Sequence, residues 1–223
     1  MKKLQAPFYF ATILGLGLAA PLVHANPPAA TQASQAAKGD LVKQIVAGRI
    51  DFTKESLEGA DLKEENLELV NLEGANLTKA ILTHTNLHSA KLVGANLTEA
   101  NLTNADLEEA NLKNATLTGA NLSGASFHNT ELHSAKLDKS NLTKAFMFQA
   151  KLIGADLTGA NLRKANLERA DLTGANLTDT DLEGTNFTGA NLTGVTGMST
   201  AKNRDKAIGL SPEHQGASLS KAH

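Results

Sequence analysis

The segment from Ala90 to Ala125 reads AKLVG-ANLTE-ANLTN-ADLEE-ANLKN-ATLTG-ANLSG-A and repeats with a period of five residues. A large apolar residue occupies every fifth position from Phe52 to Leu192, 29 times in succession, and 25 of these residues are Leu. We call this residue the centre of its repeat and number its neighbours from −2 to +2. Ala stands at −2 in 20 repeats, and Asn or Asp stands at −1 in most of them. A fixed period sustained over so many repeats indicates a solenoid.

The five-residue period favours an extended chain over an α-helix. On a helix, five residues advance by roughly 140° beyond a full turn, so the centres would spread around the axis instead of forming one apolar face. In an extended chain, the residue at −2 points to the same side as the centre. Because five is odd, the chain must also bend once per repeat, and we expect the bend just after the centre, where Gly occurs in 11 repeats. The pattern predicts an all-β solenoid with a narrow interior of Leu and Ala.

These repeats resemble those of the pentapeptide repeat family, whose consensus A-(D/N)-L-x-x is matched over roughly two thirds of the chain. The resemblance implies a right-handed quadrilateral β-helix with four repeats per coil, and therefore about seven coils for the 29 repeats. Departures from the consensus are local. Glu replaces the small residue at −2 in two repeats near the start, and the larger replacements of Asn or Asp at −1 are Ile81, Lys91, Glu131, Lys136, Phe146 and Lys151.

The composition excludes several kinds of site. The sequence has no Cys, so it can form neither disulfides nor thiolate metal sites. Its 21 basic and 23 acidic residues give a formal net charge of −2, and no basic cluster of the kind that contacts nucleic acid stands out. Aromatic residues make up only 4% of the chain, as expected for a narrow interior. We therefore expect one domain that has no nucleic-acid partner.

The N-terminal segment has the features of a secretory signal. Residues 1–25 contain two early Lys residues, an uncharged apolar run from Phe8 to Leu22, and a small-residue cleavage site before Asn26. An uncleaved membrane anchor is the alternative, but the run is short for a span of about 20 residues and contains Pro21. We expect an exported protein, periplasmic or secreted, with no stable membrane span after cleavage.

The segments next to the repeats are expected to close the ends of the solenoid. Residues 26–39 are rich in Ala, Pro, Gln and Ser and predict a flexible leader. Residues 40–51 predict a short helix, with Asp40 as N-cap and Gly48 as its end. Because the first coil of a solenoid exposes its interior and its hydrogen-bonding edge, this helix is interpreted as a cap.

The repeat domain is predicted over residues 52–195, without an internal insertion. Residues 196–210 are expected to fold over the last coil as a C-terminal cap, and residues 211–223 are expected to be a disordered tail. The apolar residues available to this cap are Val195, Met198, Ile208 and Leu210.

One group of outward-facing residues interrupts the polar surface that the repeats predict. Phe146 and Phe148 flank a centre and should both point outward, and Ile153 occupies an outward position after the next bend. Stacking by 20 residues places His128 beside Phe148 and His133 beside Ile153. We hypothesise that these five residues form a surface for partner binding or self-association, since exposed apolar patches often mark interaction sites. The alternative is that one ring packs against a neighbouring coil or a cap.

A series of His and Glu residues at +1 raises the question of a metal site. Residues spaced by 20 run Glu68, His88, Glu108, His128, Phe148 and Glu168. His88 and His128 are two coils apart, roughly 10 Å, which is too far for both to ligate one ion through bonds of about 2 Å. We interpret the series as solvated His–Glu contacts and predict neither a metal site nor a cofactor.

The sequence favours a binding function over catalysis. A convex rod without loops offers no cleft in which Ser, His and Asp side chains could converge, and no phosphate-binding loop is present. Our preferred hypothesis is a non-enzymatic exported scaffold, a monomer or weak dimer, that binds a protein or envelope component through its flat faces. The resemblance also implies an alternative, which is mimicry of duplex DNA and interaction with DNA gyrase. Gyrase is cytoplasmic, however, whereas this chain carries an export signal.

Overall fold

The computed structural model describes residues 43, 44, 48 and 50–215. The predicted signal segment over 1–25 and the leader over 26–39 lie outside the described residues. Lys43 and Gln44, which are helical, are the described part of the helix expected near Asp40, so that cap stays a prediction. Among the described residues, no helix has both the length and the apolar character needed to cross a membrane.

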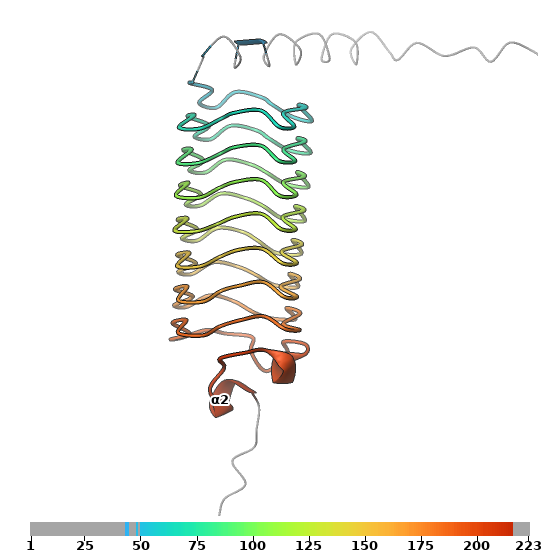
Figure 1. Cartoon of the computed structure of the whole chain (residues 1–223), viewed down its shortest axis with the longest axis vertical. Helices are drawn as coiled ribbons and strands as arrows, with labels where there is room; N and C mark the ends of the chain where they lie inside the picture. Colours follow the sequence, from blue (N-terminus) through green and yellow to red (C-terminus); the bar gives the residue numbers. More distant parts are fainter. Residues whose placement is uncertain (1–42, 45–47, 49, 216–223) are drawn as a thin grey trace, which may run out of the picture.

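The repeats wind into a straight stack of coils (Figure 1). From Asp51 to Asn176, each −1 residue pairs in parallel with the residue 20 positions later. Together with two irregular bridges near the C-terminal end, these pairs form four ladders of seven bridges each. One coil therefore contains four repeats and has four faces, which we name after their first bridge residues: the Asp51, Ser56, Asp61 and Asn66 faces. The predicted β solenoid is confirmed with one difference. In the described chain the pairing occurs as single bridges rather than extended strands, because a turn interrupts the backbone after every centre.

Every backbone N–H group of a regular repeat has a partner, and this explains the consensus. The −2 N–H donates to the preceding centre across the turn, while the −1, centre and +2 N–H groups donate to neighbouring coils. The +1 N–H donates to the side-chain oxygen of the Asn or Asp at −1. In the repeat 100–104, these five distances are 3.0, 2.9, 2.7, 3.2 and 3.0 Å in order along the chain. Such complete pairing matters because a buried, unpaired backbone group costs free energy.

The core is a single column of centres and −2 residues. All centres from Phe52 to Phe187 are at most 2% exposed, and Leu192 is partly buried. Where Thr or Ser replaces Ala at −2, its hydroxyl donates to a backbone carbonyl, as Thr85 does to Leu62 at 2.7 Å. Thr130, Thr180 and Thr185 make the same bond to the preceding coil, whereas Ser140 donates to the carbonyl of Leu137 in its own coil. These buried polar groups are therefore satisfied, as buried hydroxyls generally are.

The regular pairing continues past the predicted end of the repeats. Thr196 pairs with Asn176 at the normal spacing, but Lys202 pairs with Asp181 after 21 residues and Ile208 with Asn186 after 22. One extra residue lies between Thr196 and Lys202, and the other lies between Lys202 and Ile208, in the stretch that contains the short 3-10 helix η1 (Arg204–Lys206). The chain then enters α2 (Pro212–Gln215). The segment predicted as a cap is thus a further, irregular turn of the coil.

One detail of the predicted C-terminal cap is wrong. Met198 and Leu210 are buried as expected, but Ile208 is 56% exposed. Its bridge to Asn186 places it at an outward −1 position of the Asn66 face, so its side chain cannot cover the core. In addition, α2 lies within the segment that was expected to be disordered. The Ser211 hydroxyl is 3.0 Å from Oε1 of Glu213 and 2.7 Å from Nδ1 of His214, contacts that secure the start of this helix.

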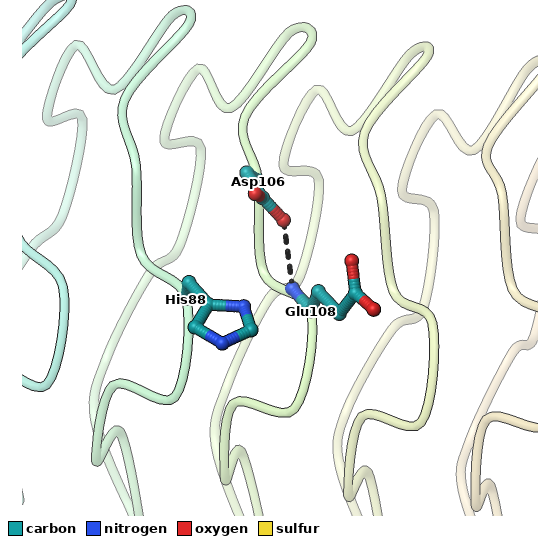
Figure 2. Close-up of side chains that lie close together, drawn as sticks. All are labelled: His88, Asp106 and Glu108. Carbon is teal, nitrogen blue, oxygen red and sulfur yellow. Dashed lines mark hydrogen bonds between the residues drawn. The ribbon is translucent and has the colours of Figure 1, made fainter.

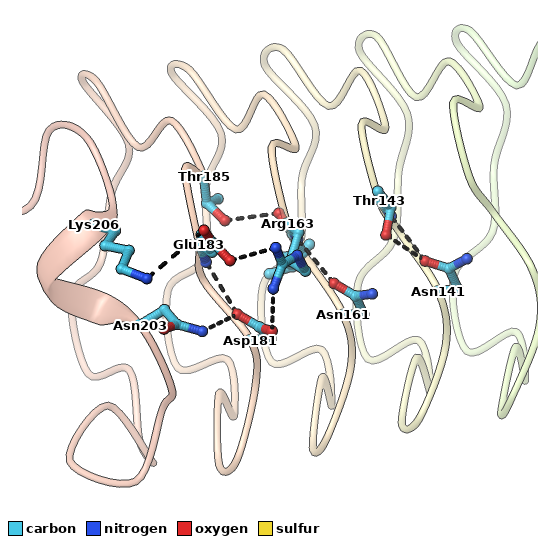
Figure 3. A network of polar contacts seen from close by, with 10 residues as sticks. Asn141, Thr143, Asn161, Arg163, Asp181, Glu183, Thr185, Asn203 and Lys206 are labelled. Carbon is cyan, nitrogen blue, oxygen red and sulfur yellow. Dashed lines mark hydrogen bonds and ion pairs between the residues drawn. The ribbon is translucent and has the colours of Figure 1, made fainter.

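Polar side chains attach the irregular turn to the last regular coils (Figure 3). Asn203 donates to Oδ1 of Asp181 at 2.8 Å, and Nζ of Lys206 lies 3.7 Å from Oε1 of Glu183. Arg163, one coil earlier, pairs with both Asp181 and Glu183. Burial raises the pKa of Asp181, but the hydrogen bonds from Asn203, the Glu183 backbone and Arg163 together lower it. The network therefore attaches the irregular turn to the Asp61 face through charge-assisted contacts.

Candidate functional site

The predicted apolar residues lie at one corner of the rod, where the Asn66 face meets the Asp51 face. We call Phe146, Phe148 and Ile153, together with His128 and His133, the aromatic corner. Phe146 occupies the −1 position of its ladder between Ser126 and Asn166, and its side chain is 58% exposed. Ile153 is 39% exposed on the adjacent face. The aromatic corner therefore extends over two adjacent faces of the rod.

Phe148 is half-buried by neighbours on both sides. The His128 ring, one coil earlier, stacks on it with a centroid separation of 5.1 Å and an interplanar angle of 20°. The Arg169 guanidinium carbon, one coil later, lies 5.8 Å from the centre of the same ring. Stacking and cation–π contacts of this kind hold an aromatic ring in one orientation. The ring is thus fixed beside the more exposed Phe146.

His133 and Ile153 are related by the ladder of the Asp51 face. The backbone N–H of Ser134 donates to the carbonyl of Ile153 at 2.9 Å, which holds the two coils in register. Nε2 of His133 is buried and has no hydrogen-bond partner among the described residues. His133 also contributes to the lowered pKa of Asp171, for which the hydrogen bond from the Thr173 hydroxyl is the largest cause. His133 is therefore a half-buried member of the corner, one coil before Ile153.

The corner differs from other exposed apolar residues of the described chain. Those residues with large side chains are Ile50, Leu69, Ile81, Phe146, Ile153 and Ile208. Among them, Phe146 and Ile153 are the pair that lies in consecutive repeats. Sequence reasoning missed Arg169, because stacking by 20 pairs it with Gln149 and not with Phe148. An Arg at the +2 position one coil after an outward aromatic ring is the signal that could have revealed it.

A hollow at the C-terminal end is a separate candidate site. A hollow of about 490 Å³ is lined by the last regular repeat together with Gly209, Ser211, Glu213 and His214. The Ser211–His214 contact has the distance of a nucleophile–base pair, but Nδ1 of His214 lies 3.9 Å from Glu213, so that carboxylate does not hydrogen-bond to the imidazole. Ser211 directly precedes α2 and its hydroxyl secures that helix, so we assign the contact a structural role.

The repeat pattern is matched by a family model described as pentapeptide repeats. Eight copies match, over residues 51–88, 80–119, 105–143, 147–179 and 165–196. Because these ranges cover more than half of the chain, the protein belongs to the pentapeptide repeat family. Proteins of this family are generally non-catalytic scaffold or interaction proteins. No curated protein matches the sequence.

Several solved structures are similar. HetL from Nostoc sp. strain PCC 7120, a pentapeptide repeat protein involved in the regulation of heterocyst differentiation, is 28% identical, with 76% of this chain and 93% of HetL covered and a TM-score of 0.53. A thylakoid-lumen pentapeptide repeat protein from Arabidopsis thaliana is 26% identical, with 52% and 86% covered and a TM-score of 0.45. QnrB1, a plasmid-mediated fluoroquinolone resistance protein, is 21% identical, with 66% and 81% covered and a TM-score of 0.35. The family likeness implies a right-handed quadrilateral β-helix, in agreement with the four ladders.

Proposed function

We propose that the protein is a non-enzymatic exported scaffold that binds a protein or envelope component through the aromatic corner. The observation that carries this proposal is Phe146, an aromatic side chain that is 58% exposed in a ladder whose other regular −1 residues, from Asn66 to Asn186, are polar. Exposing such a ring to water is unfavourable unless a partner covers it, and exposed apolar patches often mark interaction sites.

The packing around the corner supports a binding role. Phe148 is held between His128 and Arg169, so it would lose little conformational freedom when a partner covers it. The backbone beneath is fixed by bridges to both neighbouring coils, which hold the two Phe residues on one rigid surface. A preorganised aromatic group reduces the entropic cost of binding.

The proposal is tested with the double variant Phe146→Ser/Phe148→Ser. The matched control is Lys136→Ser/Asp138→Ser, which changes the same −1 and +1 positions of the same coil on the opposite face. We expect the Phe variant to lose a specific partner from an envelope extract, or a self-association seen by sedimentation, while the control keeps it. Both variants should melt close to the parent. A large drop in melting temperature confined to the Phe variant would show instead that these rings stabilise the coil.

Export is the second part of the proposal and has its own test. It rests on the composition of residues 1–25, which are typical of a cleaved signal. Cell fractionation followed by N-terminal sequencing should yield a periplasmic or secreted product that begins at Asn26. A full-length cytoplasmic product would contradict export, and it would favour the DNA-mimicry alternative, which an inhibition assay with purified gyrase would then examine.

A further inference from the structure

Three potential metal ligands meet on the Asn66 face, in the coils that precede His128 of the aromatic corner. His88, Asp106 and Glu108 each offer one ligand atom, and these atoms all lie within 4.8 Å of one another. Figure 2 shows that they come from two adjacent coils, His88 from one and both carboxylates from the next. All three side chains are half-buried. The carboxylates and the imidazole therefore share one small area of a rigid surface.

The fold brings these residues together through a diagonal contact. The +1 residue of one coil lies beside the −1 residue of the next, 18 positions later. Along this diagonal, Nδ2 of Asn121 lies 2.9 Å from Oγ1 of Thr103, and Lys113 forms an ion pair with Glu131 at 2.5 Å. The same contact joins Thr173 to Asn191 at 2.8 Å. His88 and Asp106 occupy an equivalent pair of positions.

The spacing of His88 and His128 predicts no shared metal ion, because these two residues lie two coils apart. Spacing by 20 cannot reveal Asp106, because Asp106 reaches His88 along the diagonal. With Asp106 included, the set consists of one imidazole and two carboxylates, all from within two coils.

We propose that His88, Asp106 and Glu108 bind a divalent transition-metal ion, for which zinc is the best match. Zinc accepts imidazole nitrogen and carboxylate oxygen at about 2.0–2.2 Å, commonly with three protein ligands and one water molecule. Two carboxylates also balance the charge of a divalent ion. Ligand atoms around such an ion are roughly 3.5 Å apart, so the side chains must close by about 1 Å, which rotation about their χ angles can supply.

The turn already orients one of the ligands. Oδ1 of Asp106 accepts the backbone N–H of Glu108 at 3.0 Å. This hydrogen bond fixes the Asp106 carboxylate and leaves Oδ2 for the ion. Hydrogen bonds of this kind around a metal site commonly hold its ligands in place.

Calorimetric titration of the folded chain with zinc chloride tests the proposal. We expect one saturable site per chain, with affinity reduced about tenfold or more by His88→Ala, Asp106→Asn or Glu108→Gln. The Asp106→Asn variant is the most informative. Asn at −1 accepts the backbone N–H of the +1 residue in many other repeats, so the hydrogen bond to residue 108 is kept while the charge is removed. His84→Asn is the matched control, since it removes an exposed imidazole at a turn without changing the three ligands.

Melting curves without zinc provide the check on folding. All four variants should unfold near the parent temperature in the absence of metal, and zinc should raise the melting temperature of the parent and of His84→Asn alone. Absence of saturable zinc binding by the parent chain would overturn the proposal. So would parental affinity in Asp106→Asn and Glu108→Gln, or an equal loss of affinity in His84→Asn, which would indicate non-specific binding to histidine.

Discussion

At the scale of single residues, the Asn or Asp at −1 has a structural task that sequence reasoning did not identify. Its side-chain oxygen accepts the N–H of the +1 residue, for example Thr103 bound to Asn101 at 3.2 Å. That N–H lies in a turn and points away from the neighbouring coils, so the ladders cannot satisfy it. Asn and Asp are suited to this bond because their short side chains readily reach the backbone two residues later. The consensus was visible in the sequence, but its cause required the hydrogen-bond geometry.

The +2 residue of every repeat carries a different constraint. All 29 have a positive φ, between 53° and 69°, and only 11 of them are Gly. Leu69 is the bulkiest apolar residue at this position, with φ 60° and an exposure of 62%. A side chain in the left-handed region costs roughly 1–2 kcal/mol, which exceeds the entropic cost of about 0.5–1 kcal/mol that Gly brings.

We therefore predict that Leu69→Gly raises the free energy of unfolding by about 0.5–1 kcal/mol, measured by urea denaturation. The control is Leu69→Ala, which removes the exposed side chain but keeps the Cβ atom responsible for the strain. If the Gly variant were no more stable than the Ala variant, the turn would not be strained at this position.

At the scale of a coil and its neighbours, stacked charges couple three adjacent coils. Glu131 pairs with Lys113 at 2.5 Å from the coil before and with Lys151 at 3.2 Å from the coil after. The hydrogen bond from Lys113 is the largest cause of its lowered pKa; burial opposes the shift, and Lys151 adds to it. The pKa of Glu131 is lower in the folded state than in the unfolded state, where it is about 4.3. The Glu131 carboxylate therefore makes its full contribution to stability at pH values above the unfolded-state pKa. That contribution is lost as the pH falls through the folded-state pKa.

The expected result is a pH-dependent effect of Glu131→Gln. At pH 7 the variant should be less stable than the parent by about 0.5–1 kcal/mol in urea denaturation. The gap should shrink as the pH is lowered below the unfolded-state pKa of Glu131, because protonation then removes the same charge from the parent. Glu99→Gln, which breaks a more exposed pair with Lys79 at 3.6 Å, is the control and should have a smaller effect at pH 7. If the stability difference between Glu131→Gln and the parent were equal at pH 7 and at a pH below the unfolded-state pKa, the ion pairs of Glu131 would contribute nothing to stability.

Contacts between coils also mark a limit of sequence reasoning. Stacking by 20 residues correctly predicted that His128 lies beside Phe148, since both occupy the +1 position. It missed contacts 18 residues apart, such as the 3.4 Å pair between Arg163 and Asp181, because these depend on the lean of side chains across the ladder. The cluster at His88 was missed for the same reason.

At the scale of the whole molecule, the interior was predictable and the C-terminal end was not. A large apolar residue stands at every centre and Ala stands at −2 in 20 of the 29 repeats, so the register is specified many times along the chain. After Thr196 the spacing between bridged residues changes to 21 and then 22, and no local sequence pattern predicts these insertions. The choice of partner is likewise not encoded in the repeat, since only a few outward residues, chiefly Phe146, depart from it.

The most direct test of the proposed interaction is photo-crosslinking in the native host. A photoreactive amino acid is placed at position 146, and separately at position 136, which is exposed on the opposite face of the same coil. If the aromatic corner binds a partner, we expect a discrete crosslinked product from position 146, to another protein or to a second copy of this chain, and none from position 136. Equal crosslinking from both positions, or no product from position 146, would contradict the assignment of the aromatic corner as the binding surface.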